Sequence, residues 1–263
     1  MTRVAVAVRA GTAEATGTFV IADGTGQRVG VWPAGTSAGE FREITGRPVT
    51  LRRADFPDRI PLSITDAGIR PGENTRMFIT LYPGRGSSPE QAAMLAGSLR
   101  DAGIDAAFAF WPEMHRTLRP AQFQVISELY APAVRAAGFP VLFCVSNYAA
   151  ITANALEQFW PGRDFADGVS VSFYPSGLSL KAAARFADGK GIPFGLCEFG
   201  VPDDSYQSLT FLRYIREFFA DRAAAGNQNG DLVMLSGVRD GDYTVRSEGV
   251  VQAYRDLFDT LTS

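Results

Sequence analysis

The chain has 263 residues, of which 46% are hydrophobic, with two cysteines, one histidine and a formal net charge of −3 at neutral pH. This composition can build a large core, while the small negative charge and the lack of Lys/Arg runs argue against nucleic acid or an anionic membrane as a partner. No apolar run reaches the roughly 20 residues of a membrane span, and a single histidine excludes zinc sites built on two or three histidines.

The first 27 residues alternate like a β-hairpin, in the runs "RVAVAVRA" and "TGTFVIADGTGQ". We interpret residues 1–27 as a β-hairpin appendage. The apolar patch at its start is interrupted by Arg9 and is too short and too polar for a secretion signal. We therefore expect either a cytoplasmic protein, or a chain that belongs to a larger particle or lacks its leader.

Eight short β-rich runs follow and alternate with amphipathic segments. They span residues 28–32, 48–56, 76–83, 105–113, 140–147, 168–175, 193–200 and 231–238. The clearest helix signal has Ser88 as N-cap, Pro89 at the first helical position, Gln91 at the capping-box position and Gly103 as the stop. Between the second and third runs the sequence reads as a loop, so the second helix is expected to be short or missing.

Strands that alternate with helices imply parallel pairing, and eight is the number that closes a (β/α)₈ barrel. We therefore predict an α/β protein with a TIM barrel at residues 28–263, a single catalytic domain, behind the appendage at 1–27. An open doubly wound sheet is the alternative, although no Gly-rich phosphate loop follows the first strand. We expect the protein to be a monomer.

Two kinds of feature could indicate a disulfide or a metal. Cys144 and Cys197 both lie inside apolar strand-like runs, which favours buried thiols over a disulfide or a nucleophile. The fragments "NQNGD" and "DGDY" look like parts of calcium loops but match no full spacing, and we interpret them as turns. No metal or organic cofactor is expected.

In a TIM barrel the active site lies at the C-terminal ends of the strands. Aromatic residues occur at five of the eight predicted ends. The residues at these ends are Trp32, Asp55, Tyr82, Trp111, Glu113, Asn147, Tyr148, Tyr174, Glu198, Arg239 and Asp240. A ring of aromatics suits a sugar, which stacks its C–H face on a ring and presents hydroxyls sideways. The alternative is that each aromatic only packs the rim.

Two carboxylates stand out, because Glu113 ends the fourth predicted strand and Glu198 the seventh. Strand alternation places Ala107, Ala109, Trp111 and Glu113 on one face of "DAAFAFWPE", which would aim Glu113 at the mouth. A carboxylate pair about 5–5.5 Å apart suits retaining glycoside hydrolysis. The alternative is that either residue belongs to a structural ion pair.

Glu198 is the only charge on its apolar strand, and an unpartnered buried carboxylate is costly. A nucleophile must stay ionised without being tied to a permanent cation. We expect hydrogen bonds to hold its charge, above all from the Tyr174 hydroxyl, because such bonds favour the charged form. The rival account is an ion pair with Arg239 or Arg53.

These residues carry a resemblance to the retaining (β/α)₈ glycosidases, and within them to glycoside hydrolase family 26, the β-mannanase-like group. "FWPEMHR" resembles its "HEMN" signature, and the segments 160–175 and 192–200 resemble its sixth- and seventh-strand motifs. The resemblance covers roughly residues 28–260. It implies that Glu113 is the acid/base, Glu198 the nucleophile and Tyr174 the hydrogen-bond partner of Glu198.

The match departs from the family at the substrate-contacting positions. Pro112 stands where the family has His, His115 stands at the signature Asn, and the eighth strand lacks the usual tryptophan. The resemblance therefore implies a carbohydrate substrate other than the usual mannan. The residues expected to contact it are Trp32, Asp55, Tyr82, Trp111, His115, Asn147, Tyr148 and Arg239.

The leading hypothesis is a retaining glycoside hydrolase acting on a poly- or oligosaccharide. Two alternatives stay open. One is a non-catalytic carbohydrate-binding barrel descended from such an enzyme, and the other is a different barrel enzyme whose carboxylates transfer protons.

Overall fold

The structure is a computed structural model of the whole chain. It describes residues 29–34, 51–70, 76–84, 86–146, 153–175, 180–201, 206–237 and 247–262. The predicted appendage at 1–27 lies outside the described residues, so it stays a prediction.

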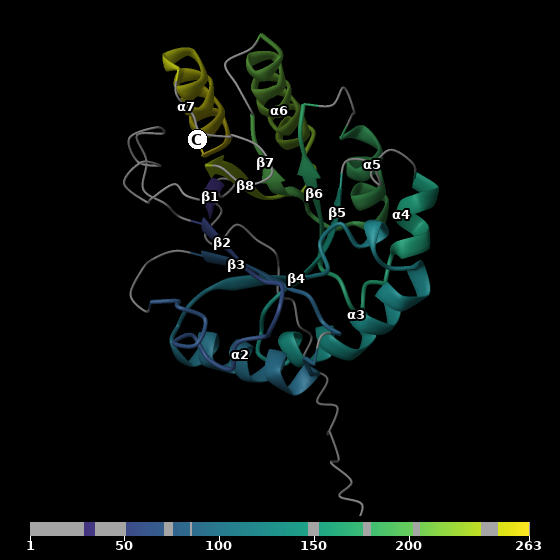
Figure 1. Cartoon of the computed structure of the whole chain (residues 1–263). Coiled ribbons are helices and arrows are strands. Elements are labelled where there is room, and N and C mark those ends of the chain that lie inside the picture. The colour runs from purple at the N-terminus through teal and green to yellow at the C-terminus, as the bar shows by residue number, and fades with distance from the viewer. Residues whose placement is uncertain are drawn as a thin grey trace, which may run out of the picture.

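Eight parallel strands form a closed barrel in the order β1 to β8 (Figure 1). The strands are β1 (Val29–Ala34), β2 (Leu51–Phe56), β3 (Arg76–Leu81), β4 (Ala106–Phe110), β5 (Val141–Ser146), β6 (Gly168–Phe173), β7 (Phe194–Phe199) and β8 (Asn229–Gly237). The barrel closes where β1 pairs with β8, with Val29 opposite Leu232 and Ala34 opposite Gly237. The predicted TIM barrel is confirmed, and the open doubly wound sheet is wrong because its two edge strands would not meet.

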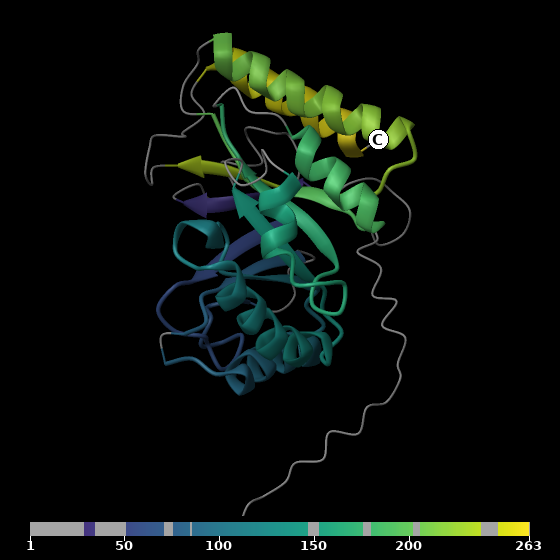
Figure 2. The same ribbon diagram turned by 90° about the vertical axis from the view of Figure 1, so that its right-hand side faces the viewer.

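The described helices lie outside the barrel wall (Figure 1). They are α2 (Pro89–Asp101), the short 3-10 helix η2 (Met114–Arg116), α3 (Pro120–Arg135), α4 (Ala153–Phe159), α5 (Lys181–Lys190), α6 (Tyr206–Ala224) and α7 (Glu248–Thr262). Helices α6 and α7 lie side by side along one flank (Figure 2). Residues 57–70, between β2 and β3, contain turns and no helix, as the sequence predicts.

Local sequence signals explain where α2 starts and ends. The backbone N–H of Ser88 donates to Oε1 of Gln91 at 2.8 Å, which is the predicted capping-box contact. Pro89 occupies the first turn, where its missing N–H costs nothing. Gly103 has φ of 67°, a left-handed conformation that glycine adopts without strain, and it stops the helix.

The core has an inner and an outer layer, which β4 shows most clearly. Ala107 and Ala109 belong to a cluster inside the barrel that also contains Leu51, Phe78, Leu142, Cys144 and Cys197. Phe108 and Phe110 belong to the layer between the sheet and the helices α2 and α3. Small residues near the axis and large ones toward the helices are what the alternation of this strand predicts.

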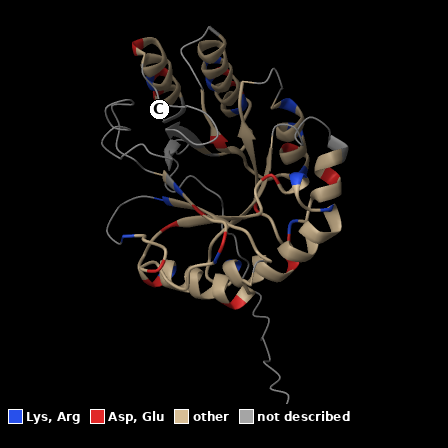
Figure 3. Ribbon diagram, viewed as in Figure 1, with Lys and Arg blue, Asp and Glu red and all other residues tan. Residues whose placement is uncertain are grey.

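Charged residues lie largely on the helices and at strand ends, while most of the barrel wall is uncharged (Figure 3). Among the described helices, none is long and apolar enough to span a bilayer. The charges that do reach the barrel interior are therefore exceptions that need a partner or a role.

Candidate active site

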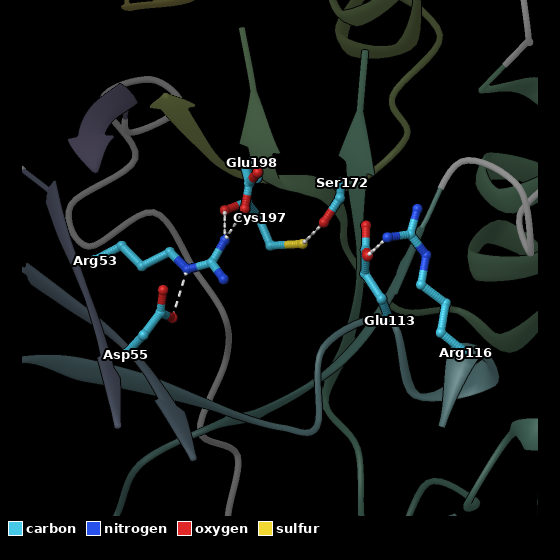
Figure 4. A network of polar contacts seen from close by, with 7 residues as sticks. All are labelled: Arg53, Asp55, Glu113, Arg116, Ser172, Cys197 and Glu198. Carbon is cyan, nitrogen blue, oxygen red and sulfur yellow. Dashed lines mark hydrogen bonds and ion pairs between the residues drawn. The ribbon is translucent and has the colours of Figure 1, made fainter. Parts of the chain in front are cut away.

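One buried cation connects two strands across the barrel. The side chain of Arg53, on β2, is only 2% exposed. Its Nη1 donates to Oε2 of Glu198 at 2.7 Å and to the carbonyl oxygen of Cys197 at 3.0 Å (Figure 4). Because β8 and β1 separate β7 from β2, the guanidinium reaches across the interior to the end of β7.

The same guanidinium binds a second carboxylate. Nε of Arg53 donates to Oδ1 of Asp55 at 2.9 Å. The side chains of Asp55 and Glu198 are 12% and 13% exposed, so both carboxylates are largely buried beside the cation. Burial opposes the charge of Arg53, but Asp55 and then Glu198 raise its pKa above the usual value, so Arg53 is charged at every accessible pH.

This arrangement corrects the expectation that Glu198 has no permanent cationic partner. The alternative was an ion pair of Glu198 with Arg239 or Arg53, and the structure shows the pair with Arg53. The physical reason is the interior itself, where the guanidinium offsets the cost of burying a carboxylate at the tip of an apolar strand. Tyr174 packs against the interior cluster at the end of β6, and its expected hydrogen bond to Glu198 stays a prediction.

Glu113 lies in a strained turn rather than on a strand. Strand β4 ends at Phe110, three residues earlier than the sequence indicates, so alternation does not orient Trp111 and Glu113. Both have left-handed backbone, with φ of 43° at Trp111 and 57° at Glu113. Bulky residues seldom adopt this conformation, and such strain clusters at functional sites.

The Glu113 carboxylate is more exposed than that of Glu198. Its side chain is 26% exposed, and Oε2 lies 3.1 Å from Nη1 of Arg116 in the same turn. Figure 4 shows Glu113 beyond Ser172 and Cys197 as seen from Glu198. Glu113 also acts electrostatically on Cys197, the residue before Glu198, so the two carboxylates belong to one neighbourhood.

Replacing Glu113 with Asn tests the strain directly. Asn tolerates the left-handed conformation better than Glu, so we expect the free energy of unfolding to rise by up to about 1 kcal/mol. Urea denaturation measures this, with Glu128→Asn at an exposed position of helix α3 as the control, which should lower stability slightly. A Glu113→Asn variant less stable than wild type would show that the turn is not strained at this residue.

Two of the predicted rim aromatics meet. The rings of Tyr82 and Trp111 pack edge to face with centroids 5.3 Å apart. Nε1 of Trp111 donates to the carbonyl oxygen of Pro83 at 2.6 Å, which ties the end of β4 to the end of β3. Trp111 also lines a shallow hollow of about 550 Å³ with Pro83 and helix α3.

His115 connects the Glu113 turn to β5. Its Nε2 lies 3.0 Å from Oγ of Ser146, the last residue of that strand. Burial, and secondarily the nearby charge of Arg116, lower the pKa of His115, so the ring is neutral at neutral pH. Its Nδ1 is buried and has no hydrogen-bond partner in the part of the chain that the structure describes.

The remaining predicted site residues are not tested by the structure. Trp32 lies on β1, where the structure gives the backbone, and Asn147, Tyr148 and Arg239 fall outside the described residues. Both cysteines are free and buried, as predicted. Their side chains share the interior cluster and are joined by a hydrogen bond, but no disulfide links them.

Sequence reasoning underrated Arg53 and missed Ser146, Ser172 and Arg116. A signal for the first was available, because Leu51, Arg53 and Asp55 alternate onto one face of "LRRADF" and Leu51 is apolar. An Arg and an Asp on the inward face of a barrel strand already indicate a buried charged pair.

Comparisons with known proteins confirm the fold. No protein-family model and no curated protein matches the sequence. The structure is similar to a modular endo-β-1,4-mannanase of glycoside hydrolase family 26 from Cellulomonas fimi, with a TM-score of 0.61 and 16% identity over 88% of this chain and 70% of that one. It is also similar to a family 128 endo-β-1,3-glucanase from Amycolatopsis mediterranei, with a TM-score of 0.57 and 13% identity over 88% of this chain and all of that one.

A third similar structure is a family 39 glycoside hydrolase from Bacteroides cellulosilyticus, with a TM-score of 0.61 and 13% identity over 90% of this chain and 64% of that one. All three comparisons cover most of the described barrel. At these identities the likeness establishes the (β/α)₈ fold, and it agrees with the family 26 resemblance at that level: the chain folds as glycoside hydrolases of several families do.

Proposed function

We propose that the protein is a retaining glycoside hydrolase that acts on a poly- or oligosaccharide, with Glu198 as nucleophile and Glu113 as acid/base. The observation that supports this most is the contrast between two carboxylates, one in the turn after β4 and one near the C-terminal end of β7. Glu198 is buried against a guanidinium, which favours its ionised form, whereas Glu113 is more exposed and pairs with Arg116, whose side chain is exposed.

The chemistry follows from this division. An Oε of Glu198 attacks the anomeric carbon while the bond to the leaving-group oxygen breaks, and Glu113 gives that oxygen its proton. Glu113 then removes a proton from water, which attacks the same carbon and releases Glu198 as a carboxylate. Tyr174, Asp55, His115 and the aromatic residues Tyr82 and Trp111 are proposed to hold the sugar and the nucleophile, together with Trp32, Asn147, Tyr148 and Arg239.

A polysaccharide-hydrolysis screen tests the proposal. The purified chain is incubated with β-mannan, β-1,3-glucan, β-1,4-glucan and xylan, and the anomer of the first product is read by NMR. We expect one substrate class to be cleaved with retention of configuration. Inversion would overturn the double-displacement mechanism.

The buried Arg53–Glu198 pair also supports a second candidate, a carbohydrate-binding barrel without catalysis. In that case the ion pair would be architectural, and Glu113 and Glu198 would only line a binding site. Binding on a glycan array without hydrolysis of any bound glycan would favour this alternative.

Substitution of Trp111 tests the sugar platform. With the preferred glycan from that array, Trp111→Ala should weaken binding by about 1–3 kcal/mol, the scale of one stacking side chain. Trp111→Phe keeps a ring but loses the bond to Pro83, so it separates stacking from support of the turn. Isothermal titration on an inactive background measures both, and an unchanged affinity in Trp111→Ala would reduce this residue to rim packing.

A further inference from the structure

One cation in the candidate active site serves two carboxylates, Glu198 and Asp55. We propose that Asp55 is a positioning residue that acts through Arg53 on Glu198, dividing the charge of the guanidinium and keeping it paired when Glu198 becomes an ester. This inference rests on the proposed function, because it assigns Glu198 the role of nucleophile. In this role Asp55 contacts Arg53, whereas the sequence led us to expect that it contacts the sugar.

The geometry holds Arg53 from both sides. Asp55 follows Arg53 by two residues on β2, so strand alternation places both on the same inward face, and the 2.9 Å contact is built into the strand. On the other side, Nη1 binds both the carboxylate of Glu198 and the carbonyl oxygen of Cys197. The guanidinium is thereby fixed to β7 by the backbone as well as by the nucleophile itself.

The covalent step shows why a second carboxylate is needed. When Oε of Glu198 bonds to the anomeric carbon, the leaving oxygen departs with the electron pair of the broken bond and takes the proton of Glu113. Glu198 is then a neutral ester, and its attraction to Arg53 is lost. The Arg53 side chain, which is 2% exposed, then loses the charge of one of its two carboxylate partners, but the bond from Nε to Asp55 remains.

Before the attack, Asp55 has the opposite influence on the same contact. A guanidinium that served Glu198 alone would stabilise its carboxylate strongly and make it a weaker nucleophile. Since Asp55 takes part of that attraction and adds a like charge, Glu198 remains ionised but less tightly held. Asp55 therefore lowers the cost of glycosylation both by raising the reactant and by stabilising the ester state.

A titration of Glu198 would also respond to the other titratable and charged groups that lie around the Arg53–Glu198 contact. Among the described residues they are Arg53 and Asp55 from β2, Glu113 from the turn after β4, Cys144 from β5, Tyr174 after β6 and Cys197 beside Glu198 on β7. Burial raises the pKa of Cys144, so this thiol stays neutral in the range where carboxylates titrate. Burial also opposes the thiolate of Cys197, but the hydrogen bond with Cys144 and the charge of Arg53 outweigh burial and lower the pKa of Cys197. Asp55 is the carboxylate that shares Arg53 with Glu198, so its replacement tests this contact while the cation stays in place.

Asp55→Asn is the test, because asparagine keeps an oxygen that can accept from Nε but removes the charge. With a dinitrophenyl glycoside of the cleaved sugar, kcat/KM, which reports glycosylation, should fall by about 10- to 100-fold, the effect of one charge-assisted contact. Deglycosylation should not slow, since a returning carboxylate gains an undivided cation. Stopped-flow measurement should therefore show a smaller burst of dinitrophenol than in wild type.

A second readout does not depend on turnover. In full-length protein labelled with [δ-13C]glutamate, the Glu198 resonance is identified by its loss in Glu198→Gln. We expect its titration to move to lower pH in Asp55→Asn by about one pH unit and to return toward wild type in Asp55→Glu. Asp105→Asn is the matched control. Asp105 pairs with buried Arg76 where β3 and β4 begin, which is the end of the barrel away from Glu198.

The outcomes separate the inference from the proposed function. Unchanged Glu198 titration in a folded Asp55→Asn variant would overturn the inference even if wild type hydrolyses glycans. Equal slowing of glycosylation and deglycosylation would make Asp55 merely structural and also overturn it. A titration shift without hydrolysis in wild type would support the coupling of Asp55 to Glu198 and overturn the hydrolase proposal.

Discussion

Replacing Glu198 with Gln is expected to abolish turnover while carbohydrate binding persists. The amide is nearly isosteric but cannot form the glycosyl ester, so kcat should fall about 10⁴-fold or more, as when other essential nucleophiles are removed. Folding should be retained, because Arg53 keeps Asp55 as its counter-ion. Initial rates on the glycan identified by screening, together with affinity measured by calorimetry, check both parts.

The control for this variant is Glu157→Gln. Glu157 also forms an ion pair, with Lys190 at 2.8 Å, but its side chain is 54% exposed on the outside of the barrel. Exposed pairs contribute little, so this change should leave kcat unaltered. Hydrolysis of the true substrate by Glu198→Gln at the wild-type rate would remove Glu198 from the mechanism.

The barrel itself was predictable because of how its strands are buried. A strand covered on both faces reads as a short apolar run, and these runs placed all eight strands within about three residues of their observed ends. Turn and cap residues such as Ser88 and Gly103 act locally, so their contacts also follow from sequence. The closing of β1 on β8 followed from the number of strands alone.

The site was only half predictable, because its contacts are not local. Arg53 and Glu198 lie 145 positions apart, and no periodicity says which of several inward cations a buried carboxylate will meet. The answer depends on a long side chain that reaches past two strands, β1 and β8, inside a closed barrel. The sequence could therefore suggest the Arg53–Glu198 ion pair as one alternative, but it could not favour this pair over the others.

The prediction that β4 continues through Trp111 to Glu113 was wrong for a different reason. Neither residue type favours positive φ, so intrinsic preference predicts that the strand continues. The tertiary structure overrides this preference: the N–H of Trp111 still bonds to the carbonyl of Leu81, while Pro112 next in the chain has no N–H to continue the ladder. Local strain of this kind is where sequence rules are expected to break down.

Substitution of Arg53 should have the largest effect on stability. Arg53→Met keeps an apolar stem but removes the guanidinium that both Asp55 and Glu198 contact, and the side chains of these two residues are only 12% and 13% exposed. Breaking a buried ion pair from one side destabilises by about 3–5 kcal/mol, so we expect a loss of this size at pH 7 and no turnover. Denaturant unfolding monitored by circular dichroism measures the loss.

The pH dependence of the stability of Arg53→Met distinguishes the loss of a charge from a simple loss of packing. In the variant the two like charges favour proton uptake, so the folded state binds more protons than the unfolded state and stability rises as the pH falls from 7 toward 4. In wild type, Asp55 and Glu198 raise the pKa of Arg53 in spite of its burial, and this mutual attraction is lost when the carboxylates take up protons. The difference in unfolding free energy between the two proteins should therefore shrink on acidification.

Two further variants decide whether repulsion between the carboxylates causes the loss of stability in Arg53→Met. Arg53→Met combined with Asp55→Asn removes the repulsion and should recover much of the lost stability at pH 7, because only one buried carboxylate remains. Arg76→Met breaks the pair with Asp105, whose side chain is 47% exposed, and should cost less without a pH-dependent recovery. If Arg53→Met lost the same free energy at pH 4 and pH 7, the guanidinium would act by filling space, and the charge argument for Glu198 and Asp55 would fall with it.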